Sequence, residues 1–144
     1  MKSLRWTLLL ILLVSVAAAQ KSSDPAKERD ARAKDGFVVK VGEELKIERE
    51  GLRIAFVSVK EDSRCPEGAT CVWAGNARAH VSARDEKGNC EEFDLNTNLT
   101  PNGHDFGKYK ISLAQLTPHP SIHHQPKADE YVATFVVTKE VKKK

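Results

Sequence analysis

Apolar and polar residues alternate along most of the chain after residue 36. In residues 71–83, every second position from Cys71 onward is Cys, Trp, Gly, Ala or Val, whereas Arg78 and His80 lie at the positions between them. Successive side chains of a β-strand point to opposite faces, so this pattern predicts one long, half-buried strand. Gly75 marks a position suited to a bulge or a bend.

Six further segments indicate strands. Residues 52–60 carry apolar residues on both faces, which is typical of a strand in the middle of a sheet. No stretch of the chain shows a sustained helical period. The five remaining segments cover residues 37–41, 44–49, 90–96, 109–116 and 131–141.

Residues 99–107 and 117–130 are rich in turn-forming residues and are predicted to be loops. About seven strands within residues 36–139 predict a single all-β domain. The expected architecture is an antiparallel β-sandwich or a partly closed barrel.

Residues 1–19 have the three parts of a secretory signal peptide. Lys2 and Arg5 lie at the start, residues 6–16 are almost entirely apolar, and small residues lead up to Ala19. The apolar run is shorter than the roughly 20 residues that a membrane span requires. We expect cleavage after this alanine and export to the periplasm or the outside, with no transmembrane segment left.

Cleavage would nearly neutralise the chain. Among the 144 residues, 23 Lys and Arg oppose 20 Asp and Glu, a net charge of +3, and residues 1–19 hold two of the positive charges. Residues 20–35 are charged, contain no large apolar residue and are predicted to form a flexible tether. Residues 140–144 form a basic tail with three lysines. Without this tail the domain is mildly acidic, which argues against a nucleic-acid partner.

The predicted export bears on the redox state of the three cysteines of the chain. Cys65 and Cys71 are separated by five residues that include Pro and Gly, and an exported chain favours a disulfide between them. A redox dithiol usually has two intervening residues, and a zinc clip needs a second pair of ligands. Trp73 is predicted to pack over the bridge. Cys90 is expected to be a free, partly buried thiol, with pairing to another chain as the alternative.

Residues 62–77, with the sequence DSRCPEGATCVWAGNA, carry a recognisable motif. The motif is similar to one in small exported bacterial β-rich proteins of unknown function, in which Asp-Ser-Arg-Cys-Pro precedes Cys-Val/Ile-Trp-Ala-Gly and an alternating strand. Residues 109–120 and the closing strand also resemble that group. The resemblance implies export and fold, but no chemistry.

The leading functional hypothesis is a non-catalytic binding or accessory module of the cell envelope that presents the disulfide-closed loop. A constrained loop loses less conformational entropy on binding than a free one. The sequence does not specify the partner, which is a protein or another envelope ligand. The candidate contact residues are Arg64, Pro66, Glu67 and Trp73 on the loop, and Arg78, His80 and Arg84 on the polar strand face.

Asp62, Ser63 and Arg64 precede the first cysteine of this loop. Asp and Ser side chains often hydrogen-bond their own backbone, so these two are predicted to shape a turn. Two roles are open for the arginine, which either pairs with an acid across the sheet or stays exposed as a contact residue.

Three histidines in one Pro-rich loop suggest an alternative function. His119, His123 and His124 lie within six residues, and imidazoles in an exported protein can bind copper or zinc. A plain polar loop explains the same residues without a metal.

No catalytic motif is present. Asp62, Ser63 and His80 offer the residue types of a hydrolase, but the histidine lies far along the predicted strand. The chain has no nucleophile elbow, no phosphate-binding glycine loop and no zincin helix. We therefore predict that the protein is not an enzyme and needs no cofactor.

Overall fold

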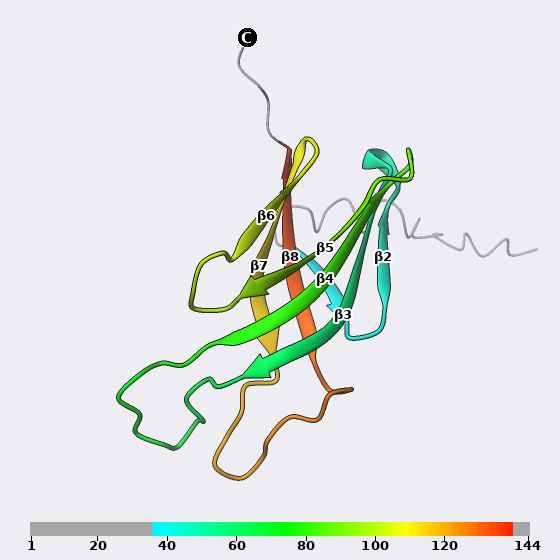
Figure 1. Ribbon diagram of the computed structural model, residues 1–144. Coiled ribbons are helices and arrows are strands. Elements are labelled where there is room, and N and C mark those ends of the chain that lie inside the picture. The colour runs from blue at the N-terminus through cyan, green and yellow to red at the C-terminus, as the bar shows by residue number, and fades with distance from the viewer. Residues whose placement is uncertain (1–35, 140–144) are drawn as a thin grey trace, which may run out of the picture.

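The structure is a computed structural model that describes residues 36–139 (Figure 1). The predicted signal peptide, tether and basic tail lie outside these residues. The described chain forms two antiparallel sheets of four strands each, which confirms the predicted β-sandwich with one disulfide.

Each sheet combines strands that are distant in the sequence. The first has the order β1-β8-β7-β6 and the second the order β2-β3-β4-β5. The first sheet contains β1 (Phe37–Lys40), β6 (Gly103–Phe106), β7 (Tyr109–Thr117) and β8 (Val132–Lys139). The second contains β2 (Glu44–Ile47), β3 (Leu52–Asp62), β4 (Ala77–Asp85) and β5 (Cys90–Asn96), with a short 3-10 turn η2 (Glu48–Glu50) between β2 and β3.

The hydrophobic core lies between the two sheets. Along β4 the alternation is as predicted, because Ala77, Ala79, Val81 and Ala83 are fully buried and the residues between them face outward. Phe56 of β3 and Phe135 of β8 meet edge to face across the core, with ring centroids 6.1 Å apart. The prediction that residues 52–60 form a central strand is confirmed, since β3 pairs with both β2 and β4.

The long strand predicted for residues 71–83 was wrong at its beginning. Residues 71–76 belong to a loop, and β4 starts only at Ala77. The chain there turns back on itself, because Ser63 N–H donates to the Asn76 carbonyl (2.8 Å) and Cys65 N–H donates to the Ala74 carbonyl (2.9 Å).

The loop predicted for residues 99–107 contains an additional strand. Four of its residues form β6, which pairs with β7 through the tight hairpin at Gly107. Phe106 is buried beneath this hairpin, and its packing outweighs the turn-forming composition of the segment.

Two long loops lie at the same end of the sandwich, in the lower part of Figure 1. One joins β3 to β4 and contains the disulfide, and the other joins β7 to β8 and contains the histidines. An isolated bridge between Glu67 and Ser121 connects them. The hairpins β4–β5 and β6–β7 lie at the opposite end.

Candidate functional site

The disulfide between Cys65 and Cys71 closes the β3–β4 loop, with the two Cα atoms 5.9 Å apart. Beyond the second cysteine the loop extends into solvent, where Val72 is 90% exposed and Trp73 is 81% exposed. The prediction that the indole packs over the bridge was therefore wrong. Trp73 is a surface residue of the β3–β4 loop, two residues beyond the segment that the disulfide closes.

Removing the disulfide is expected to lower the free energy of unfolding by about 2 kcal/mol, because a closed loop of this size restricts the unfolded chain only modestly. The double variant Cys65→Ser/Cys71→Ser avoids leaving a second reactive thiol in addition to Cys90, and denaturant unfolding measures the effect. Cys90→Ser is the control and should change stability by less than about 1 kcal/mol. Equal stability of all three proteins would show that the bridge contributes nothing.

Arg64 lies beneath this loop and is only 5% exposed, so the prediction that it is a contact residue was wrong. Its Nε and Nη2 donate to the two carboxylate oxygens of Asp62, at 2.8 and 2.6 Å. Its Nη1 donates to the Leu116 carbonyl (2.7 Å), and Nη2 also donates to the Pro118 carbonyl (2.8 Å). The planar guanidinium thus joins the end of β3 to the end of β7 in the other sheet.

Asp62 completes this buried network. Its carboxylate also accepts hydrogen bonds from the Arg64 backbone N–H (3.2 Å) and from the Tyr131 hydroxyl (2.9 Å). Burial favours the neutral acid, but the hydrogen bonds from Arg64 and Tyr131 outweigh it and lower the pKa of Asp62. Burial, with the neighbouring carboxylate, raises the pKa of Tyr131 to about 12. Within residues 36–139, every buried side-chain nitrogen and oxygen has a hydrogen-bond partner.

Acid is expected to destabilise the protein through Asp62. Because its pKa is lower in the folded state, the unfolded chain binds the proton first as the pH falls, and protonation then favours unfolding. The stabilisation is present above the ordinary pKa of 3.8 and is lost progressively below it. Urea unfolding between about pH 5 and pH 2.5 measures this loss. Asp62→Asn should start less stable and lose less on acidification, whereas an equal decline in both proteins would argue against this role.

A second polar cluster fixes the other side of the loop. Asn76 Nδ2 donates to Asn96 Oδ1 (2.8 Å), and Asn98 N–H donates to Asn76 Oδ1 (3.1 Å). Asn98 Nδ2 donates to the Gly75 carbonyl (2.7 Å). These amides tie the disulfide loop to the β5–β6 loop. The sequence did not predict these hydrogen bonds, because asparagines in separate segments of the chain show no pattern that indicates mutual pairing.

A hollow of about 440 Å³ lies beside this cluster. Its walls include Glu61, Trp73, Arg78, Asn98 and Leu99. Trp73 and Arg78 were predicted as members of two separate surfaces, the loop and the polar strand face. The structure brings them together in one hollow.

Basic residues on the polar face of β4 pair with acidic residues of the neighbouring strands β3 and β5. Arg78 lies 3.6 Å from the Glu61 carboxylate and 3.8 Å from that of Asp94. His80 Nδ1 lies 2.7 Å from the same aspartate, and Arg84 is exposed farther along the strand. These side chains face outward as predicted, but only Arg78 lines the hollow.

The β7–β8 loop supports the disulfide loop through its backbone. Glu67 N–H donates to the Pro120 carbonyl (2.8 Å), and Ile122 N–H donates to the Glu67 carbonyl (3.0 Å). The Glu67 side chain is exposed and Pro66 is half-buried beside it, so both of these predicted contact residues lie at the loop surface.

The predicted histidine ligands His119 and His124 have separate hydrogen-bond partners. His119 Nε2 donates to the Cys65 carbonyl (2.9 Å), because a carbonyl oxygen can only accept. His124 Nε2 pairs with Glu130 (2.9 Å), and His123 is exposed. In the part of the chain that the structure describes, no three His, Cys, Asp or Glu residues are placed to hold a metal ion. The first of these histidines instead braces the disulfide loop.

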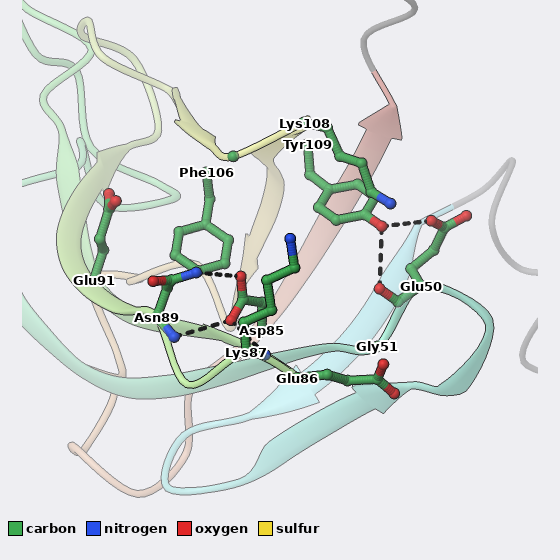
Figure 2. Close-up of a pocket in the computed structure, with 11 residues that line it drawn as sticks. Glu50, Gly51, Asp85, Glu86, Lys87, Asn89, Glu91, Phe106, Lys108 and Tyr109 are labelled. Atoms are coloured by element: carbon green, nitrogen blue, oxygen red, sulfur yellow. Dashed lines mark hydrogen bonds between the residues drawn. The ribbon is translucent and has the colours of Figure 1, made fainter.

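A second hollow, of about 470 Å³, lies at the opposite end of the sandwich (Figure 2). The Tyr109 hydroxyl donates to the Glu50 carboxylate (2.6 Å), which also pairs with Lys139 (3.2 Å). Burial and this carboxylate raise the pKa of Tyr109 to about 12. Asp85 accepts from the backbone and the side chain of Asn89, as the dashed lines show. The carboxylates of Glu50 and Asp85 are thus engaged by the protein itself.

Cys90 is a free thiol at the start of β5. It is exposed, so the expectation of partial burial was wrong. Its Sγ lies 3.7 Å from Ser82 Oγ on the neighbouring strand.

Comparison of the chain with protein families, with curated proteins and with solved structures finds no match. The resemblance of residues 62–77 to exported bacterial proteins therefore stays a prediction. Among residues 36–139, no helix has the length and apolar character needed to cross a membrane.

Proposed function

We propose that this protein is an exported, non-catalytic binding module of the cell envelope, and that it binds through the end of the sandwich that holds the disulfide-closed loop. The observation that carries the proposal is the position of Trp73, which is 81% exposed two residues beyond the disulfide and next to Ala74, whose carbonyl accepts a hydrogen bond from Cys65 N–H. We call this end the loop face, defined by four exposed apolar residues of three loops: Val72, Trp73, Leu99 and Ile122.

The exposed side chains of the loop face contribute little to the core. Val72 and Trp73 point into solvent, whereas the buried Arg64 and the disulfide hold the loop in place. Tryptophan is among the residues that contribute most often to binding energy. A loop that is already ordered keeps more of this energy on binding, since less conformational entropy is lost.

The envelope location rests on the predicted signal peptide and on the disulfide. Disulfides persist in oxidising compartments such as the periplasm and the extracellular space. Intact mass of the exported protein tests this part of the proposal. It should give a chain that begins at Gln20 and a single alkylatable thiol, Cys90. A chain that keeps residues 1–19, or three alkylatable thiols, would contradict export.

Site-specific photo-crosslinking tests the loop face without assuming the ligand. A benzophenone side chain inserts into C–H bonds and therefore traps proteins and glycans alike. Placed at Val72 in cells that export the protein, it should give a discrete adduct. The same group at Val38, an exposed position on β1, is the matched control and should give none.

The adduct should weaken in the Cys65→Ser/Cys71→Ser background, because the loop is then no longer closed. Equal labelling from Val72 and Val38, or no labelling from either, would overturn the proposed loop face.

A further inference from the structure

The hollow beside Trp73 has a chemical character that narrows the class of ligand. Trp73 contributes a large aromatic surface, and Leu99 of the β5–β6 loop adds apolar surface to the same hollow. An exposed aromatic ring has an electron-rich face that attracts weakly positive C–H groups. One side of a pyranose ring presents such C–H groups, while its hydroxyls point outward.

Some polar groups of the hollow are hydrogen-bonded within the protein, and others have no such partner among the described residues. Asn76 and Asn96 hydrogen-bond to each other and lie buried, so they form a rigid floor. Among residues 36–139, neither the Trp73 indole N–H nor Asn98 Oδ1 has a hydrogen-bond partner. One free donor and one free acceptor beside an apolar surface suit a ligand that both accepts and donates, as hydroxyl and acetamido groups do.

The charges of the hollow favour a neutral ligand. Glu61 and Arg78 are the charged residues that line it, and their side chains lie 3.6 Å apart as an ion pair. Neither a phosphate nor a cationic peptide would meet an unpaired opposite charge there. The volume of about 440 Å³ falls within the range of about 300–1,000 Å³ typical of small-ligand sites.

The hollow is held in shape before any ligand binds. Asn98 Nδ2 donates to the Gly75 carbonyl, two residues beyond the tryptophan, and the disulfide closes the loop on the other side. These contacts keep Trp73 and Asn98 at the same hollow, so that little ordering is needed on binding.

From these observations we infer that the Trp73 hollow binds a neutral saccharide chain, with one sugar ring stacked on the indole. An N-acetylated sugar is favoured over one with hydroxyls alone, because its acetamido group adds an apolar methyl for Leu99 to an N–H that can donate to Asn98 Oδ1. This inference rests on the proposed function and names the ligand class for the loop face.

Titration with two trisaccharides tests the inference. Tri-N-acetylchitotriose and cellotriose share the linkage and the ring, but only the first carries acetamido groups. Each is added to the exported protein labelled with ¹⁵N, and the indole N–H resonance is followed by NMR. Trp6 is removed with residues 1–19, so the exported protein should give one indole N–H signal, from Trp73, and Trp73→Phe confirms this assignment. The acetylated sugar should shift it with half-saturation on the order of 1 mM, and cellotriose should bind several-fold more weakly.

Two variants test whether the Trp73 indole accounts for binding. Trp73→Ala should weaken binding of the acetylated trisaccharide by at least about tenfold, as judged from backbone amide shifts of Asn98. Val38→Ala is the matched control, since this valine is exposed on β1 outside both the hollow and the loop face, and it should keep the affinity within about twofold.

The two proposals fail differently. No shift of the Trp73 indole with either sugar up to about 10 mM, or unchanged binding in Trp73→Ala, overturns the saccharide site. If Val72 then still gives a specific photo-adduct, and the adduct is a protein, the loop face is a protein-binding surface. If the photo-adduct is also absent, both proposals are wrong.

Discussion

Replacing Arg64 with alanine is expected to lower the free energy of unfolding by about 3–5 kcal/mol, which is the cost of breaking a buried ion pair by removing one partner. The variant leaves the buried Asp62 carboxylate without its guanidinium and removes the side-chain donor from the carbonyls of Leu116 and Pro118. Denaturant unfolding followed by circular dichroism measures the loss. The end of β3 is also expected to loosen from the end of β7, because the guanidinium joins the two.

Arg78→Ala provides the control for this variant. Its side chain is 44% exposed and pairs at 3.6 and 3.8 Å, so its removal should cost at most about 1 kcal/mol. Arg64→Lys should fall between the two, since an ammonium keeps the charge but cannot reach the carboxylate and both carbonyls with fixed geometry. Equal losses in Arg64→Ala and Arg78→Ala would show that the buried network does not anchor the loop.

Replacing Gly75 with alanine is expected to cost about 3 kcal/mol or more. Gly75 has a φ of +71°, and a Cβ atom there would lie 1.8 Å from the Ser63 carbonyl oxygen. The left-handed conformation alone costs a non-glycine residue roughly 1–2 kcal/mol. Relieving the clash requires the backbone of the facing segment to move, at about 1–3 kcal/mol in addition. Thermal or urea unfolding measures the sum.

Gly107→Ala separates these two contributions. Gly107 has a similar φ of +61° in the β6–β7 hairpin, but a Cβ atom there meets nothing within 4 Å. This variant should therefore lose only the roughly 1–2 kcal/mol of backbone strain. If both alanine variants are equally stable, the close approach of Ser63 to the loop does not constrain the fold.

The sequence predicts the fold class because a strand that is buried on one face must alternate. The alternation of residues 77–84 and the apolar character of residues 52–60 correspond to β4 and β3. Prediction from the alternation failed where hydrogen bonds to a distant strand decide whether a segment forms a strand. Residues 71–76 alternate but form a loop, and β6 has the composition of a loop but is held by β7 and the buried Phe106.

Some features of the candidate site could be predicted from the sequence, and others could not. The spacing of Cys65 and Cys71 in a chain predicted to be exported was sufficient to predict their disulfide, because the short separation can be read from the sequence and export would place the chain in an oxidising compartment. The exposure of Trp73, the burial of Arg64 and the meeting of Asn98 with Gly75 were decided only by the tertiary structure. Arg64 is buried where β3 meets the end of β7 from the opposite sheet. The carbonyls that accept from its guanidinium lie more than fifty residues along the chain. A local pattern carries no information on such partners, since they come within reach only when the two sheets pack together.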